Sequence, residues 1–239
     1  MKNEGFLLIN KPAGITSHDV VDRVRRITGI RKVGHAGTLD PFATGLLIIG
    51  IGRSATREMQ TLQGLDKTYE AIFVLGAHSD TDDKEGVIEN KPCSEDITDS
   101  LIEEKLESFL GQIEQIPPMY AAIKVKGKKL YELAREGKTI ERKPRTITIH
   151  EIKRLGTVTQ ENGLFRVSVF INCSTGTYIR SIARDLGELL GGGGYVESLN
   201  RTTIGPFSLS NAHTLEEVAK KGWETLLIEP EDLKQQLSQ

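Results

Sequence analysis

The chain has 239 residues, which is enough for one large domain or two small ones with a sizeable hydrophobic core. Hydrophobic residues make up 38% and charged residues 27%, so the composition is that of a soluble globular protein. The longest apolar run, residues 45–51, has the length of a strand and is too short to span a membrane. The N-terminal stretch MKNEGFLLINKPAG carries an acid and no cleavage site, which argues against a signal peptide.

The net charge is −2 at pH 7, but the charge is unevenly distributed along the chain. Residues 120–154 contain eleven Lys or Arg against four acids, whereas residues 80–115 contain twelve acids against three bases. A basic segment of this kind is typical of a protein with a polyanionic partner. The alternative is a solvated surface whose charges balance after folding, and the sequence does not decide between the two.

In chain order, the first half is predicted to form a strand at 6–10, a helix at 17–28, a loop at 30–44, a strand at 45–51, a helix at 54–62, a strand at 67–75, an acidic surface loop at 80–94 and a helix at 97–110. The second half is predicted to form short strands and a short helix at 116–145, paired strands at 147–155 and 164–172, a helix at 177–190, a glycine loop at 191–194, a strand at 201–209 and a last helix from 214. Ser17 and Thr177 are expected N-caps, and Thr214 with Glu217 forms a capping box. The mixture predicts an α+β fold with a mixed, mostly antiparallel central sheet flanked by helices.

The two cysteines, Cys93 and Cys173, show no spacing typical of a metal site. This usage predicts a reduced, cytoplasmic protein without a bound metal.

The stretch GHAGTLDPFATGLL at residues 34–47 holds a single carboxylate, Asp40, between glycines and Pro41. Such a loop can hold one side chain in a fixed pose next to a rigid strand. A carboxylate there can cap a helix, exchange protons or attack carbon, and no nearby Cys or His cluster supports a metal. The competing interpretation is a turn-forming Asp before Pro, which is common.

Six separated segments resemble, in order, the TruB family of tRNA pseudouridine synthases, and they are spread along the chain from residue 10 to residue 207. They are NKPAGITS at 10–17, GHAGTLDPFATGLL at 34–47, KTYEAIFVLG at 67–76, IPPMYAAIKVKGKKLYELAREG at 116–137, CSTGTYIRSIARDLG at 173–187 and LNRTTIGPF at 199–207. The resemblance implies the pseudouridine synthase fold, with an inserted basic segment like a thumb. It also implies an isomerase that converts the T-loop uridine of tRNA, position 55, to pseudouridine after base flipping. No cofactor is needed, because the glycosidic bond breaks and re-forms within one nucleotide.

By the same resemblance, Asp40 is the catalytic aspartate, acting through either a nucleophilic or a glycal route. Arg180 in TYIR would pair with this carboxylate and keep it ionised. Tyr69 in KTYE would lie against the target base and is a candidate for a proton-transfer step. Without the resemblance, Arg180 reads as a surface ion pair on a helix and Tyr69 as a half-buried strand residue.

The resemblance also implies residues that bind the substrate RNA. His35 would fill the space left by the flipped base, and Tyr178 and Leu199 would contact that base. Without the motif, His35 reads as a loop histidine bonded to backbone and Leu199 as core.

Four lysines complete the predicted binding residues. Lys11 would support the active-site loops, and Lys67 is grouped with it as a substrate-binding residue. Lys126 and Lys128 belong to a clamp of about residues 112–146 that would meet the phosphates of the T-arm.

Residues 1–210 are predicted to form the catalytic domain, and residues 211–239 a short helical tail. A further C-terminal RNA-binding domain of the PUA type, carried by larger family members, is expected to be absent. The expected protein is a cytoplasmic monomer that binds tRNA. Two alternatives stay open: a non-catalytic tRNA-binding or tRNA-folding module, and a guide-RNA-dependent relative of the box H/ACA type.

Overall fold

The computed structural model describes residues 4–93, 96–121, 124–125, 128–129 and 140–237. The chain forms two compact units. Unit 1 contains residues 1–70 and 199–239, and unit 2 contains residues 71–198. Two strands, β4 (Lys67–Leu75) and β12 (Gly194–Ile204), contain residues of both units.

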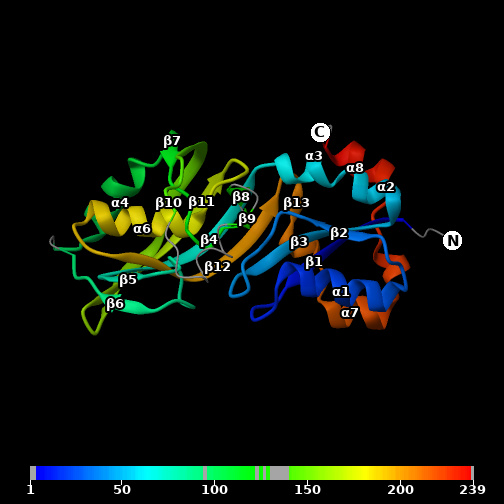
Figure 1. Ribbon diagram of the computed structural model, residues 1–239, viewed down its shortest axis with the longest axis horizontal. Helices are drawn as coiled ribbons and strands as arrows, with labels where there is room; N and C mark the ends of the chain where they lie inside the picture. The colour runs from blue at the N-terminus through cyan, green and yellow to red at the C-terminus, as the bar shows by residue number, and fades with distance from the viewer. Residues whose placement is uncertain (1–3, 94–95, 122–123, 126–127, 130–139, 238–239) are drawn as a thin grey trace. The chain divides into compact units, whose positions relative to one another are not determined.

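Unit 1 contains a sheet with helices on both faces (Figure 1). Its other strands are β1 (Gly5–Lys11), β2 (Val33–Ala36), β3 (Thr44–Ile51) and β13 (Phe207–Ser208). Its helices are α1 (Ser17–Thr28), α2 (Gly52–Arg57), α3 (Met59–Gly64), α7 (Leu215–Lys221), α8 (Pro230–Leu237) and the 3₁₀ helices η1 (Leu209–Asn211) and η2 (Trp223–Leu226). Strand β3 pairs antiparallel with β1 and β2 and parallel with β12.

The alternation of side chains along β1 and β3 divides the core of unit 1 into two layers. Leu7 and Ile9 face α1 and α7, where they pack with Val20 and Val218. The residues between them face α2, α3 and α8; Leu8, for example, packs in the same cluster as the side chains of those helices. Because both faces are covered, the central runs of β1 and β3, FLLI and LLII, are apolar without alternation.

Unit 2 contains a sheet in the order β4-β11-β10-β7. The strands of unit 2 in that sheet after β4 are β7 (Gly111–Gln115), β10 (Arg145–Glu161) and β11 (Leu164–Cys173). Two separate strand pairs are β5 (Ala77–Ser79) with β6 (Ile88–Asn90) and β8 (Lys124–Val125) with β9 (Lys128–Lys129). Its helices in the described residues are α4 (Asp99–Glu107), which packs on β10, and α6 (Ile179–Leu189). The long antiparallel hairpin β10–β11 turns at residues 161–164.

The predicted fold class is confirmed, since the chain is α+β with a mixed, mostly antiparallel sheet and flanking helices. The predicted capping box of Thr214 and Glu217 is also confirmed. The predicted short helix within residues 116–145 falls largely outside the described residues.

Four local predictions were wrong. The N-cap of α1 is Thr16, which forms a capping box with Asp19, whereas Ser17 turns its hydroxyl toward Leu39. The N-cap of α6 is Tyr178 rather than Thr177, whose hydroxyl donates to Ser174 O. The predicted loops at 30–44 and 80–94 contain strands β2 and β6.

No helix in the described part of the chain is both long and apolar enough to cross a membrane. The same residues contain no group of three or more His, Cys, Asp or Glu side chains that could hold a metal ion.

Candidate active site

Asp40 lies in unit 1, in the loop of residues 37–43 that joins β2 to β3. Its side chain is half-buried, and its main-chain oxygen accepts a hydrogen bond from Ala43 N over 3.2 Å. Next to it, Leu39 is buried and Pro41 O accepts from Gly14 N over 2.9 Å. The backbone around the carboxylate is therefore fixed by partners from other segments, as the sequence motif predicts.

Lys11 at the end of β1 is fully buried, and its ammonium holds the same loop. It donates to Pro12 O over 2.9 Å, to Ile15 O over 2.7 Å and to Pro41 O over 3.2 Å. These bonds tie the turn after β1 to the residue that follows Asp40. These contacts agree with the prediction that Lys11 supports the active-site loops. Contact of Lys11 with RNA stays a prediction.

Ser17, the first residue of α1, holds the loop one position before Asp40. Its hydroxyl donates to Leu39 O over 3.0 Å and accepts from Leu39 N over 2.8 Å. Ser17 is 2% exposed, so water does not compete for these two main-chain groups. The sequence predicts Ser17 only as a helix cap, because nothing local links residues 17 and 39.

The predicted catalytic residue Tyr69 and two predicted substrate-binding residues of unit 1 lie on the neighbouring strands. His35 is half-buried on β2, Tyr69 is buried on β4, and Leu199 is buried on β12. Leu199 O accepts from the Thr44 hydroxyl over 3.4 Å, which ties it to the start of β3. The roles of these side chains toward a base stay predictions.

His35 has an unusual environment for an imidazole. Its Nδ1 atom is buried and has no hydrogen-bond partner in the described residues. Burial lowers the pKa of His35, and the positive charge of Arg201 lowers it further. The neutral form is therefore favoured at physiological pH.

Lys67 at the start of β4 is 6% exposed, and its ammonium donates to Gln63 O over 2.6 Å and to Leu65 O. These carbonyls belong to the end of α3 and the residue after it. A lysine at this place stabilises the entry into β4. Its predicted contact with substrate is not supported by these partners and stays a prediction.

Arg180 lies in unit 2, in the first turn of α6, and is 4% exposed. Its guanidinium donates to Thr81 O over 2.9 Å and to Tyr120 O over 2.9 Å, and pairs with Asp83 over 3.4 Å. Asp83 is 4% exposed, so this ion pair is shielded from water. Sequence reasoning anticipated a carboxylate for Arg180 but did not find Asp83; the pairing of Arg180 with Asp40 stays a prediction.

A second ion pair lies one turn along α6, where the partly buried Arg184 pairs with the buried Asp82 over 3.1 Å. Burial raises the pKa of Asp82, and the nearby charges of Arg184 and Arg180 act in the opposite direction. Asp82 adopts a φ of 59°, a left-handed angle that Asp tolerates better than most residues. The predicted acidic surface loop therefore includes two buried carboxylates that hold α6.

Tyr178, the N-cap of α6, is fixed through its main chain. Tyr178 N donates to Gln115 Oε1 over 2.8 Å, and Gln115 Nε2 donates to Tyr178 O over 3.0 Å. Gln115 is 2% exposed, and it was not among the residues singled out from the sequence.

The predicted RNA-clamp lysines lie in a segment of which the structure describes only some residues. Lys128 lies in β9, whose backbone pairs with β8, and Lys126 lies outside the described residues.

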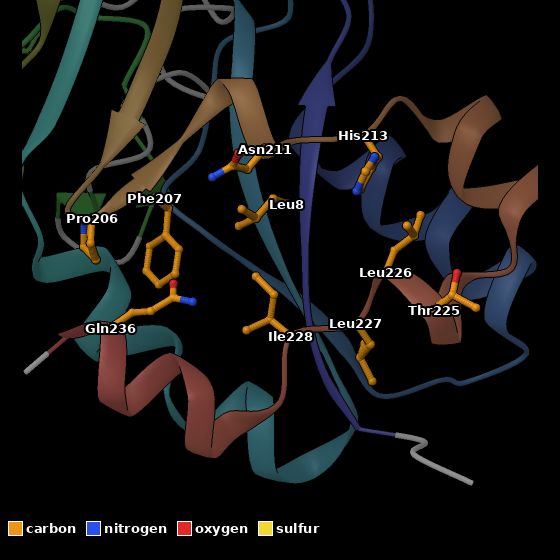
Figure 2. A pocket seen from close by; sticks show the side chains of 10 residues that line it. All are labelled: Leu8, Pro206, Phe207, Asn211, His213, Thr225, Leu226, Leu227, Ile228 and Gln236. Carbon is orange, nitrogen blue, oxygen red and sulfur yellow. The ribbon is translucent and has the colours of Figure 1, made fainter.

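A cavity of about 330 Å³ lies elsewhere in unit 1, at the outer edge of β1 (Figure 2). That edge forms isolated bridges from Phe6 to Ile228 and from Ile9 to His213, and Leu8 lines the opening between them. The lining mixes apolar and polar side chains and contains none of the predicted site residues. A second cavity, of about 380 Å³, lies in unit 2 and is lined in part by Arg184.

Two family models match the chain. The model described as TruB family pseudouridylate synthase (N terminal domain) matches residues 25–179, and the model described as tRNA pseudouridylate synthase B C-terminal domain matches residues 180–238. The division of the chain at residue 210 into catalytic domain and tail stays a prediction.

Curated relatives are similar over most of their length. The tRNA pseudouridine synthase B of Thermobifida fusca is 46% identical over 219 residues, which cover 90% of this chain and 74% of that protein. The protein of the same name from Moorella thermoacetica is 44% identical over 230 residues, which cover 95% of this chain and 74% of that protein.

Solved structures with a similar fold come from box H/ACA assemblies. A chain of a Cbf5-Nop10-Gar1 complex matches with a TM-score of 0.69 and 28% identity over 91% of this chain and 54% of that chain. A chain of an H/ACA RNP bound to a substrate RNA containing 2′-deoxyuridine matches with a TM-score of 0.66 and 27% identity over 96% of this chain and 57% of that chain. This chain thus spans little more than half the length of those two.

Proposed function

The chain belongs to the TruB family of pseudouridylate synthases, and from this premise we propose that it converts the T-loop uridine of tRNA, position 55, to pseudouridine. The reaction breaks the bond between C1′ of the ribose and N1 of uracil, rotates the base and joins C1′ to C5. The C5 proton is released and N1 regains one, so the nucleotide keeps its composition. No redox step and no group transfer to a second substrate is required.

The observation that carries this proposal is the fixed backbone around Asp40. Ser17 binds both main-chain groups of Leu39, and Lys11 binds Pro41 O, so the residues on either side of Asp40 are held. Holding a reacting carboxylate in one pose lowers the entropy cost of reaching the transition state. An ionised carboxylate suits attack on the oxocarbenium-like carbon of the nucleotide, or removal of a sugar proton in a glycal route.

We assign the other roles as the family resemblance implies. Arg180 keeps Asp40 ionised and oriented, and Tyr69 lies against the flipped base. His35 occupies the position the base leaves, and Tyr178 and Leu199 contact the base. The low pKa of His35 supports a neutral ring, which inserts into a base stack without the cost of desolvating a charge.

The phosphates of the T-arm are assigned to the basic clamp of residues 112–146, with Lys126 and Lys128 as contacts. This segment accounts for RNA binding by a chain whose net charge is −2. We also propose a cytoplasmic monomer, which light scattering of the purified protein tests. Cys93 and Cys173 form no disulfide, in keeping with a reducing compartment.

The test is to incubate the protein with an unmodified tRNA transcript, without guide RNA, and to map pseudouridine along the product. The expected result is a single site in the T-loop. A protein that binds the transcript without forming product would favour a non-catalytic tRNA-binding module. Product that appears only when a guide RNA is added would favour a relative of the box H/ACA type.

Asp40→Asn provides the decisive variant. It should form no detectable product while binding tRNA with nearly the affinity of the wild type, because the lost charge faces the base rather than the phosphates. Asp22→Asn is the matched control, since Asp22 is a partly exposed carboxylate of α1. Substantial product from Asp40→Asn would remove Asp40 from the chemistry.

A further inference from the structure

Arg201 is a fully buried arginine in unit 1 that lies in the segment LNRTTIGPF but has no role in the proposed chemistry. It lies on β12 and is 1% exposed. Its strand runs parallel to β3, with Arg201 opposite Gly45. Burying a guanidinium is costly unless its donors are satisfied, so the partners of Arg201 indicate what it is for.

The guanidinium binds the two ends of the segment that carries Asp40. Arg201 Nη2 donates to Gly37 O over 2.9 Å, and Arg201 Nε donates to Leu46 O over 2.8 Å. Gly37 begins the loop before Asp40, and Leu46 lies in β3 just after it. Both of these acceptors are main-chain carbonyls, so the side chain joins backbone to backbone.

Two glycines of the GHAGTLDPFATG segment lie next to this arginine, and Gly45 makes room for its backbone. A Cβ atom at Gly45 would lie 2.3 Å from Arg201 O and 2.6 Å from Arg201 N, a distance that real Cβ atoms do not show. A Cβ atom at Gly37 would lie 3.4 Å from Arg201 Nη1, and Gly37 has a φ of +77°. The motif around Asp40 and the distant Arg201 are therefore fitted to each other.

We propose that Arg201 is a positioning residue for Asp40, which fixes the catalytic loop at Gly37 as Ser17 fixes it at Leu39 and Lys11 at Pro41. The proposal rests on the proposed function, since it assigns Asp40 the catalytic role. With Arg201 removed, the loop is held only from Leu39 onward, and the carboxylate samples poses from which it does not react. Arg201 touches neither the substrate nor the reacting atoms and acts through the main chain.

The test compares Arg201→Gln, Arg201→Lys and the control Arg23→Gln, an exposed arginine of α1. For each protein, single-turnover pseudouridine formation and equilibrium binding are measured with one unmodified tRNA transcript. For Arg201→Gln we expect the rate to fall about 100-fold, the size typical of a displaced reacting group, with an affinity for tRNA within about twofold of the wild type. Arg201→Lys should recover part of the rate, because an ammonium can reach one of the two carbonyls, and Arg23→Gln should match the wild type.

A second readout does not depend on activity. Arg201 lowers the pKa of His35, so His35 measured by NMR should titrate at higher pH in Arg201→Gln but not in Arg201→Lys. If Arg201→Gln fails to fold, Arg201→Lys is used in its place. A rate below that of the wild type with unchanged tRNA affinity and an unchanged His35 titration then supports the positioning role. A rate unchanged from the wild type, or a rate loss matched by an equal loss of tRNA affinity, would overturn the positioning role. Absence of product from the wild type itself would instead reject the proposed function.

Discussion

The hydroxyl of Ser17 allows a prediction whose size follows from its contacts. It satisfies both Leu39 N and Leu39 O, at 2.8 and 3.0 Å, and the residue is 2% exposed. Ser17→Ala leaves a buried donor and a buried acceptor without a partner, each at a cost of about 1–3 kcal/mol. The two groups together would cost about 2–6 kcal/mol, and since the loop can relax we expect a total near the lower end of this sum, about 2–3 kcal/mol. For a chain of this length the loss corresponds to a fall in Tm of roughly 4–12 °C.

The assay is thermal unfolding followed by circular dichroism, together with the single-turnover rate on tRNA. The rate should fall more than the affinity for tRNA, because Leu39 immediately precedes Asp40. Ser100→Ala is the matched control, since Ser100 is an exposed residue in the first turn of α4 and should change stability by no more than about 0.5 kcal/mol. Equal Tm values for Ser17→Ala and Ser100→Ala would refute the reasoning that Ser17 holds the loop.

Three further predictions concern charge. Asp83→Asn leaves the buried Arg180 without its carboxylate and should cost about 3 kcal/mol, measured by chemical denaturation; a cost below that of an exposed substitution would contradict the ion pair. The lowered pKa of His35 means that the unfolded chain binds its proton first, so stability from this residue is intact above about pH 6.5 and is lost as the pH falls below it. His35→Gln should therefore weaken the loss of Tm on acidification, and an unchanged pH profile would count against this cause. Replacing Lys126 and Lys128 together should weaken tRNA binding and reduce its salt dependence by about one unit of slope per lost phosphate contact, and an unchanged slope would remove them from the interface.

Local pattern was sufficient for the elements whose stability is decided nearby in the chain. Helix α1 follows from its apolar spacing and from Gly29, which ends it at a φ of 72°. The capping box of Thr214 and Glu217 needs only residues three positions apart. The strands β1 and β3 follow from continuous apolar runs, because both of their faces are covered.

The errors arose where a partner lies far along the chain. Ser17 looked like a cap because its acceptor, Leu39, is 22 residues away. Asp82 and Asp83 looked like part of a solvated loop because Arg180 and Arg184 follow about a hundred residues later. A charged pair is recognised as buried only once both segments are brought together.

The candidate site shows the same limit. The residues assigned to chemistry and base contact came from family resemblance, since an Asp before Pro is by itself more often a turn residue. Arg201 went unnoticed, although LNRTTIGPF was recognised as a segment, because an arginine in a strand is normally exposed. The backbone of Arg201 approaches Gly45 closely, but a glycine in a sequence does not show which segment lies against it.

Unit 1 is discontinuous, with its first 70 residues and its last 41 separated by the whole of unit 2. During synthesis the segment bearing Asp40 therefore leaves the ribosome long before Arg201 does, and unit 2 is able to fold first as an uninterrupted stretch. Pairing of β12 with β3 closes a loop of more than a hundred residues, a step that is slow because the intervening chain must be ordered. Nascent chains and fragments ending before residue 201 should thus carry the carboxylate without its contacts to Arg201, so we expect RNA modification only from chains that extend past this residue.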